Sequence, residues 1–211
     1  HLDGRLVWTA GGKIYYSNYV VNHNWVLEGD TWKTKIWDEL GDIYPGNFWS
    51  DGTNTYYSHY SRQYVFNKET DTWEPKTWNG LASFYGEYIW TDGTNIYYSD
   101  NSNQYVLNKE TDTWEPKTWS GDVTRLDARY IWSDGTNLYF TPTESSWYIR
   151  NGDTWEYIDT PYYLYKMDLK KFWTDGNELY YSDITYLDVQ KQILSYAIGD
   201  GGLKNKTWLG P

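Results

Sequence analysis

Short runs of β-forming residues alternate with polar turns along the whole chain. In residues 88–99, for example, the runs YIWT and NIYYS flank an Asp-Gly turn. Tyrosine, isoleucine and tryptophan are enriched in strands, and Asp-Gly between two such runs is a strong hairpin signal because glycine tolerates a positive φ. No stretch shows a sustained 3.6-residue apolar period, and residues 188–194 predict one helical turn at most. The pattern therefore predicts an all-β fold.

The run–turn–run pattern recurs five times, with a period of about 41 residues. A tryptophan near the start of each copy is followed three positions later by a glycine, and then by a pair of aromatic residues. The five opening tryptophans are Trp8, Trp49, Trp90, Trp132 and Trp173, and two further columns are Trp32, Trp73, Trp114 and Trp155, and Trp37, Trp78, Trp119 and Trp208. Five units, 1–41, 42–82, 83–124, 125–165 and 166–211, cover nearly the whole chain.

Each unit contains two more runs after the hairpin, such as QYVLN and DTWEPKTW. A proline in the fourth run suits an edge strand, where one missing N–H breaks no ladder. Four strands per repeat of about 40 residues are the signature of a propeller blade. We therefore expect residues 1–211 to form a single domain, a five-bladed β-propeller of four-stranded antiparallel blades. Because the first run opens the first unit and a fourth run ends the last, closure would depend on side-chain packing between the first and last blades.

One dodecapeptide, NKETDTWEPKTW, occurs without change at residues 67–78 and 108–119. It contains a turn and the outermost strand of a unit. We expect its tryptophans, Trp73 and Trp114, to fill the gap between neighbouring blades. The segment QYVLNKETDTWEPKTW…YIWTDGTNIYYS resembles the kelch type of repeat, which implies a propeller but no particular function. The diglycine of that family is absent, and YYSD or YYSH stands in its place. The Trp-x-Asp-Gly form is also similar to tandem repeats of bacterial and phage surface proteins.

Charge and composition narrow the range of partners. The net charge of −11 argues against a nucleic-acid backbone or an anionic membrane as the main partner. The chain has no cysteine, which excludes disulfides, a thiolate nucleophile and zinc-finger spacing. No apolar run approaches the ~20 residues that span a bilayer, so we expect no membrane insertion. We expect a monomer without a cofactor, and an extracellular or virion surface is favoured over other locations.

The five units differ in two sets of loops. Turns between the first and second strands barely change, whereas those between the second and third strands differ in every unit, from HYSRQ to DITYLDVQKQILS. The connections from a fourth strand to the next unit also diverge. In a four-stranded up-and-down blade these two sets emerge at the same edge, which we call the variable-loop face. Because variable loops on a rigid scaffold usually carry function, we expect the ligand there.

Nine residues of the variable-loop face are candidates for ligand binding: Tyr44, Tyr60, Arg62, Tyr85, Glu87, Asp127, Arg129, Tyr165 and Asp168. Aromatic rings beside planar polar groups suit sugar stacking, or a hot spot for a protein partner. Each residue taken alone also fits a loop residue that packs beneath its neighbours. Phe84 lies in the same loops. His23, His59 and Asp100 lie in consecutive loops as well, but such residues are more often solvated than metal ligands, so we expect no metal site.

The favoured interpretation is a non-catalytic binding propeller that recognises a protein or a glycan, with lectin-like carbohydrate binding as one form. The alternative is a glycoside hydrolase, because five-bladed propellers with paired carboxylates at the central funnel perform that chemistry. Asp127 and Asp168 are the best pair, since they occupy equivalent places before the first strand of neighbouring units. The loops are short and leave few residues to close a water-excluding pocket. We therefore expect no catalytic residues.

Overall fold

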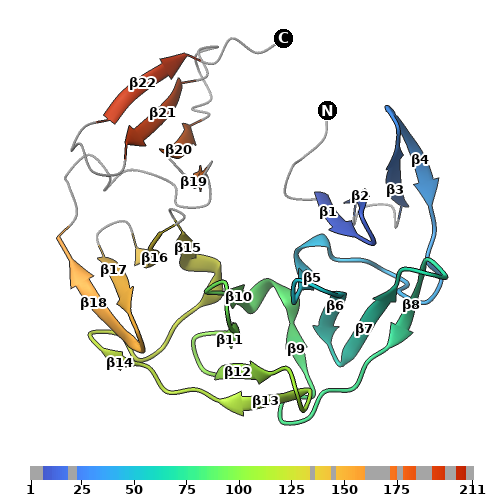
Figure 1. Ribbon diagram of the computed structural model, residues 1–211, viewed down its shortest axis with the longest axis horizontal. Coiled ribbons are helices and arrows are strands. Elements are labelled where there is room, and N and C mark those ends of the chain that lie inside the picture. The colour runs from blue at the N-terminus through green and yellow to red at the C-terminus, as the bar shows by residue number, and fades with distance from the viewer. Residues whose placement is uncertain are drawn as a thin grey trace. The chain divides into compact units, whose positions relative to one another are not determined.

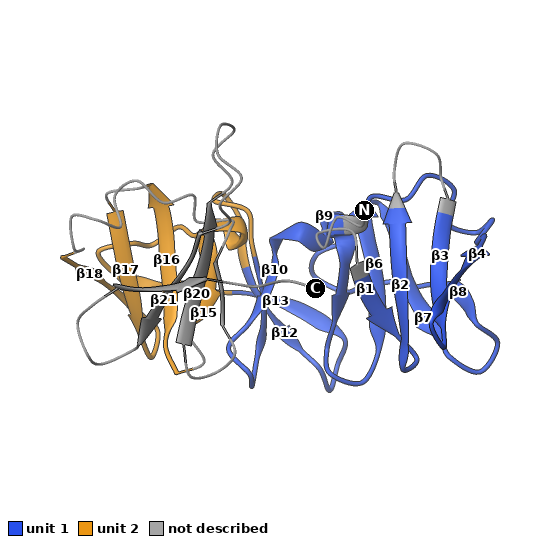
Figure 2. Cartoon of the chain, turned by 90° about the horizontal axis from the view of Figure 1, so that it is seen from above, with its two compact units in different colours: residues 1–98, 105–116 blue, residues 99–104, 117–211 orange. Residues whose placement is uncertain are grey.

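The computed structural model describes residues 7–18, 23–133, 136–143 and 146–159, and further along the strand segments 172–174, 178–183, 192–197 and 203–207. The chain forms two compact units (Figure 2). Unit 1 contains residues 1–98 and 105–116, and unit 2 contains residues 99–104 and 117–211. The boundary passes through one of the repeats instead of a linker. A single domain over residues 1–211 stays a prediction.

The described strands form five sheets, and each sheet contains four consecutive strands joined as an antiparallel meander (Figure 1). Sheet 1 contains β1 (Val7–Ala10), β2 (Lys13–Asn18), β3 (His23–Glu28) and β4 (Thr31–Lys35). Sheet 2 contains β5 (Phe48–Ser50), β6 (Thr55–Tyr60), β7 (Arg62–Asn67) and β8 (Thr72–Pro75). Sheet 3 contains β10 (Ile89–Thr91), β11 (Ile96–Ser99), β12 (Gln104–Asn108) and β13 (Thr113–Pro116).

The later repeats follow the same order. Sheet 4 contains β15 (Ile131–Ser133), β16 (Leu138–Thr143), β17 (Ser146–Asn151) and β18 (Thr154–Ile158). Sheet 5 contains β19 (Phe172–Thr174), β20 (Glu178–Asp183), β21 (Gln192–Ala197) and β22 (Leu203–Thr207). The all-β fold and the four strands per repeat are confirmed, whereas a closed five-bladed ring stays a prediction. The sequence allows one helical turn at 188–194, but residues 192–194 belong to strand β21, and residues 188–191 lie outside the described residues.

Two short strands extend sheets in ways that the repeat pattern does not predict. Strand β9 (Phe84–Tyr85) pairs antiparallel with the end of β6, and β14 (Ser120–Gly121) pairs parallel with β18. Three 3-10 turns, η2 (Pro45–Asn47), η3 (Gly86–Tyr88) and η4 (Ala128–Tyr130), precede the first strands of sheets 2, 3 and 4. Both features lie in the connections between repeats.

The repeated tryptophan and aromatic pair have a shared local explanation. Across the first hairpin, Trp8 lies opposite Tyr15 and the two rings stack at 4.5 Å. The pairs Trp49–Tyr56, Trp90–Tyr97 and Trp132–Tyr139 stack at 4.4 Å in the next three sheets. The indole N–H of Trp8 also donates to Ser17 at 2.8 Å, and that of Trp49 donates to Ser58 at 2.8 Å. The motif thus fixes the hairpin register and satisfies a buried donor.

Sheets within unit 1 pack through the tryptophans of the duplicated dodecapeptide. Trp73 lies 5.8 Å from Trp8 and 6.1 Å from Trp37 of the preceding repeat. Trp114 lies 6.1 Å from Trp49 and 6.0 Å from Trp78, again in the preceding repeat. Trp73 and Trp114 are 2% and 1% exposed. The dodecapeptide is therefore scaffold, as the sequence indicates. Of the opening tryptophans, Trp49 and Trp90 are buried, and Trp132 is half-buried.

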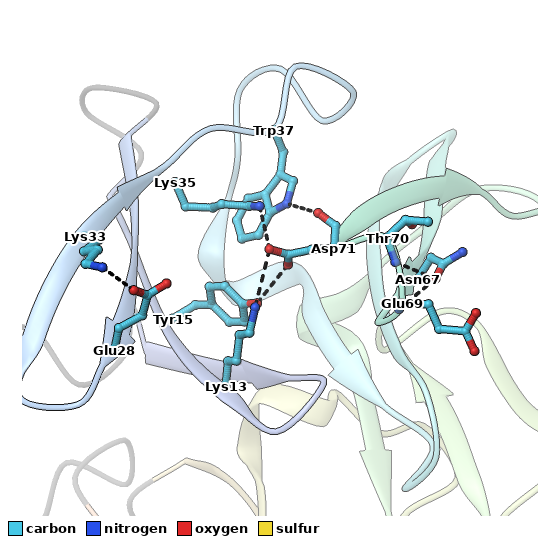
Figure 3. A network of polar contacts seen from close by, with 10 residues as sticks. All are labelled: Lys13, Tyr15, Glu28, Lys33, Lys35, Trp37, Asn67, Glu69, Thr70 and Asp71. Atoms are coloured by element: carbon cyan, nitrogen blue, oxygen red, sulfur yellow. Dashed lines mark hydrogen bonds and ion pairs between the residues drawn. The ribbon is translucent and has the colours of Figure 1, made fainter.

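A polar contact joins neighbouring repeats beside these tryptophans, and we call it the Lys–Asp clasp. The ammonium of Lys35 lies 2.6 Å from a carboxylate oxygen of Asp71, which belongs to the next repeat (Figure 3). The same lysine lies 5.5 Å from the ring centre of Trp37. The equivalent pairs are Lys76 with Asp112, and Lys117 with Asp153 at 2.6 Å. Lys76 and Lys117 also lie 4.6 and 4.9 Å from the rings of Trp78 and Trp119.

Asp71 collects further contacts around the clasp. Its carboxylate accepts from the Tyr15 hydroxyl at 3.2 Å and lies 3.6 Å from the Lys13 ammonium, while its carbonyl accepts from the Trp37 indole at 3.2 Å (Figure 3). Burial alone would raise the pKa of Asp71, but the hydrogen bond and charge of Lys35, together with Lys13, outweigh it and lower the pKa. Burial and the Asp71 charge raise the pKa of Tyr15. The ionised aspartate is therefore part of the folded state.

Candidate functional site

The variable loops of the second repeat come together within unit 1. The β6–β7 turn places His59 opposite Tyr85 and Tyr60 opposite Phe84, through the pairing of β6 with β9. Arg62, on the other side of that turn, reaches the connection that precedes sheet 2, where its guanidinium donates to the carbonyls of Leu40 at 2.8 Å and Asp42 at 3.0 Å. Loops from three positions in the sequence therefore share one edge, as the sequence predicts.

Four side chains at this edge form a cluster that we call the aromatic platform: Tyr44, His59, Tyr60 and Tyr85. Tyr44 stacks on His59 at 4.3 Å between ring centres, with 9° between the planes. Tyr85 lies 5.3 Å from His59 edge to face, and 6.3 Å from Tyr60. Tyr44 and Tyr60 are 44% and 60% exposed. The platform therefore presents tyrosine surface to solvent on a base that its own stacking holds in place.

Tyr60 holds an unfavourable backbone conformation. It is the first central residue of a two-residue turn between His59 and Arg62, and its φ is +57°. Bulky side chains rarely adopt this left-handed region, which asparagine visits more easily. The equivalent residue of the next repeat is Asn101, with a φ of +71°. The third repeat therefore places asparagine, which tolerates a positive φ, at this turn, whereas the second repeat places a strained and exposed tyrosine there.

Arg62 and Gln63 hold the loops in position. Besides its two carbonyl contacts, Arg62 has its Nη2 3.2 Å from Nδ1 of His59 and 3.5 Å from the Tyr57 hydroxyl. The buried Gln63 donates from Nε2 to the carbonyl of Tyr60 at 2.5 Å and that of Phe84 at 3.3 Å. Gln104 makes the corresponding bond to Leu126 at 2.9 Å in unit 2. Arg62, predicted as a ligand residue, thus directs its guanidinium to the protein itself.

The protonation of His59 depends on the same contacts. Burial lowers the pKa of His59 below its ordinary 6.5, and the charge of Arg62 lowers it further, against a smaller opposing effect of Glu87. Because arginine only donates, Nδ1 of His59 accepts from it, which requires that nitrogen to be unprotonated. His59 is therefore neutral at pH 7 and serves as a stacking surface.

A close backbone approach joins the two connections beneath the platform. At Gly86 a Cβ would lie 2.1 Å from the carbonyl oxygen of Asn47, so only glycine fits where η3 contacts η2. Glu87 follows directly and is exposed. The carboxylate of Glu87 and that of Asp42, also exposed, form no ion pair with any residue that the structure describes. Two exposed acidic residues thus belong to the connections that carry Tyr44 and Tyr85.

The corresponding position in unit 2 has a different chemistry. There Asp100 pairs with Asp127, at the places that His59 and Tyr85 occupy in unit 1. Asp127 caps η4 by accepting from the backbone N–H of Arg129 at 3.1 Å. The Arg129 guanidinium binds both carboxylate oxygens, at 3.0 and 2.7 Å. Asp127 is 8% exposed and its oxygens are engaged by Arg129, so the proposed glycosidase carboxylate has a structural partner.

The nine predicted residues fall into three groups. Unit 1 brings Tyr44, Tyr60, Arg62, Tyr85 and Glu87 together, Asp127 and Arg129 pair with each other in unit 2, and Tyr165 and Asp168 lie outside the described residues. Phe84, which the sequence places among the exposed loop aromatics, is instead buried at 1% exposure. The sequence suggests His59 only as a possible metal ligand, whereas in the structure it forms the centre of the platform. Its position directly before the turn that carries Tyr60 is the sequence feature that indicates a place in the same cluster.

Other kinds of site find no support in the described part of the chain. No group of three or more His, Cys, Asp or Glu side chains is arranged to hold a metal ion there. Among the described residues, no helix has the length and apolar character needed to cross a bilayer. A groove at the opposite, invariant turns of unit 1 is lined by Gly11, Asn54, Phe66, Lys68 and Glu69, among others. The turns between first and second strands barely change between repeats, and those between third and fourth strands, which carry Lys68, Glu69 and Lys109, come in two lengths with similar residues. We call these two sets, which differ least between repeats, the invariant turns.

Comparison with known proteins identifies the fold. No family model matches the chain, and no curated protein matches its sequence. Among solved structures, the chain is similar to the extracellular domain of BT4673 from B. thetaiotaomicron, with a TM-score of 0.53, 11% identity and 96% of this chain covered. It is also similar to PorZ of Porphyromonas gingivalis, an essential bacterial surface component of the type-IX secretion system, with a TM-score of 0.51, 8% identity and 93% covered.

The chain has a β-propeller-like fold. It spans 29% of the BT4673 chain and 26% of the PorZ chain. At such low identity the likeness concerns the fold alone. A relation to kelch repeats in particular stays a prediction from the sequence.

Proposed function

We propose that this protein is a non-catalytic, five-bladed binding propeller that recognises a macromolecular partner, a protein or a glycan, through the aromatic platform. The sheets provide a rigid base, and the platform lies at the edge where the repeats differ. The similar PorZ is a bacterial surface component, which supports an extracellular location for this chain too.

The observation that carries the proposal is the strained and exposed Tyr60. An exposed side chain contributes little to the core, so packing does not account for a backbone conformation that costs roughly 1–2 kcal/mol. Asn101 shows that the same turn forms with a residue that tolerates a positive φ. Strain of this kind tends to accumulate at functional sites. The tyrosine is therefore best explained by what it contacts outside the protein.

Catalysis receives less support from the same geometry. Asp127 is bound to Arg129 and caps η4, which accounts for it structurally. A hydrolytic mechanism needs two carboxylates across a sugar, one of them as general acid. Turnover of an aryl glycoside that disappears in Asp127→Asn would restore the hydrolase alternative.

The substitution Tyr60→Asn tests the proposal. Because asparagine relieves the backbone strain, we expect the melting temperature to rise or stay level while binding is lost. Binding is measured in two ways, on a glycan array and by capture from the native source with immobilised protein. The variant Lys109→Ala, in an exposed turn of the invariant set, serves as the control and should keep binding.

Two outcomes contradict the proposal. If Tyr60→Asn binds every target as the wild type does, the platform is not the binding surface. If Lys109→Ala or Lys68→Ala abolishes binding instead, the ligand occupies the invariant turns and the wrong edge has been chosen.

A further inference from the structure

The chemistry around the aromatic platform favours one class of ligand, and this inference rests on the proposed function. Tyr44 and Tyr60 expose a large part of their rings, and the face of a tyrosine ring attracts a cation within about 6 Å. Glu87 is exposed two residues after Tyr85, and its charge acts on the central His59. A Cβ built at Gly46 would lie 3.9 Å from the Cβ of Glu87. Asp42, also exposed, lies two residues before Tyr44. A cation held between a ring and a carboxylate gains from both.

The positive charge of the site itself is directed inward. The guanidinium of Arg62 contacts two backbone carbonyls, the Tyr57 hydroxyl and the His59 ring, all on the protein. It therefore fixes the loops and does not neutralise Glu87 by a direct ion pair. His59 is the basic group of the platform itself, and its lowered pKa, together with the bond that its Nδ1 accepts from Arg62, keeps it uncharged at pH 7.

Unit 2 contains a pairing that unit 1 lacks. At the position equivalent to Tyr85, Asp127 binds the guanidinium of Arg129 through both oxygens, and Arg129 lies 5.9 Å from the ring of Tyr130. Arg129 is the counterpart of Glu87 in the repeat alignment. Unit 2 thus supplies its own guanidinium at this edge, whereas unit 1 presents tyrosines and a carboxylate.

We propose that the aromatic platform binds a positively charged side chain, arginine or lysine, from an exposed basic segment of a partner protein. The guanidinium or ammonium group lies over Tyr60 or Tyr44 and pairs with Glu87. The net charge of −11 on the chain attracts such a segment from a distance. An acidic glycan would meet repulsion from the same charges.

A pair of peptides tests this directly. One is a glycine peptide with two arginines, and the other carries citrulline in their place, which keeps the shape of arginine but has no charge. Calorimetric titration at low salt should show binding of the arginine peptide, with citrulline binding at least about tenfold weaker, since a cation–π contact and an ion pair are both lost. Binding of the arginine peptide should weaken as salt is added.

Two carboxylate variants show whether the site is the platform. Glu87→Gln should weaken binding of the arginine peptide several-fold, and Tyr60→Asn should weaken it as well. Glu69→Gln removes an exposed carboxylate from an invariant turn and should have no effect. Equal binding of the two peptides, no binding at millimolar arginine peptide, or equal effects of Glu87→Gln and Glu69→Gln would each overturn the proposal.

The same variants separate this inference from the proposed function. If a native partner is lost with Tyr60→Asn but retained with Glu87→Gln and at high salt, the platform binds its target but the target is not basic. A glycan signal that Tyr60→Asn abolishes would assign a sugar instead. If Tyr60→Asn changes nothing, the proposed function itself fails.

Discussion

The Lys–Asp clasp allows a sharp test of how the repeats are joined, through the substitution Asp71→Asn. Asparagine keeps the size of the side chain and also tolerates the positive φ of +57° at this position. Its amide can still contact the Tyr15 hydroxyl. The change therefore removes the negative charge that Lys35 and Lys13 approach, and little else.

The size of the effect follows from the exposure of the partners. Hydrogen bonds to charged groups contribute about 1.5–3 kcal/mol when buried, and exposed ion pairs about 0.2–1 kcal/mol. The side chains of Asp71 and Lys35 are 29% and 25% exposed, so the clasp lies between these limits. We expect Asp71→Asn to lower the free energy of unfolding by about 1–2 kcal/mol, which corresponds to a fall in Tm of roughly 2–8 °C for a protein of this size.

The matched control is Asp30→Asn. Asp30 occupies the same turn in the first repeat, is exposed, and forms no ion pair with a residue that the structure describes. Its substitution should change the free energy of unfolding by less than about 0.5 kcal/mol. Urea unfolding and thermal scans of the three proteins measure both effects. Equal losses in Asp71→Asn and Asp30→Asn would refute the argument that the clasp joins neighbouring repeats.

The pH dependence gives an independent check on Asp71. Its pKa is lowered in the folded protein from an ordinary 3.8, so its contribution is complete above pH 3.8 and is lost as the pH falls through the folded pKa. The difference in stability between wild type and Asp71→Asn should therefore be constant near neutral pH and shrink below about pH 3.8. A difference that stays constant into strong acid would mean that charge is not the cause.

Three further predictions concern the core, a turn and the platform. Trp114→Ala should lower the free energy of unfolding in urea by about 3–5 kcal/mol, because Trp114 is 1% exposed between sheets. Ile36 is 63% exposed, so Ile36→Ala should lower it by less than about 1 kcal/mol. Similar losses in the two variants would contradict the packing of Trp114. Gly93→Val should lower the free energy of unfolding by about 2 kcal/mol, because Gly93 has a φ of +88°. Thr94→Val in the same turn should leave it nearly unchanged. Equal stability of the two variants would contradict the need for glycine in this turn. Because the folded pKa of His59 lies below 6.5, the free energy of unfolding should fall as the pH drops below 6.5. The substitution His59→Phe keeps the stacked ring and should remove part of that fall. An unchanged pH profile in the variant would show that the pKa of His59 is the same in the folded and unfolded states.

The sequence predicts the strands well because the information that sets them is local. Trp49 and Tyr56 lie opposite each other in the hairpin of β5 and β6, and the Asp-Gly turn between these strands is set by residues of the turn itself. The shared edge of the variable loops also follows from the strand order alone. The burial of Trp73 against the preceding repeat follows from the copied dodecapeptide.

The arrangement of the site depends on contacts that no local pattern reveals. The inward direction of Arg62 is set by carbonyls about twenty residues earlier, at Leu40 and Asp42. Phe84 looks like an exposed loop residue in the sequence, but its pairing in β9 turns it into the core. The stacking of Tyr44 on His59 joins two loops that the sequence places 15 residues apart.

The Lys–Asp clasp has a direction, since each of the three joints that the structure describes takes a lysine from one repeat and an aspartate from the next. A repeat of this kind carries a donor on one flank and an acceptor on the other. Duplication of one unit within the gene would therefore copy both halves of a matching joint, and the new unit would fit between its parent and the following neighbour without compensating changes. The number of units can then change during evolution while each joint is preserved, and a verbatim copy such as NKETDTWEPKTW is what a recent event of this kind would leave.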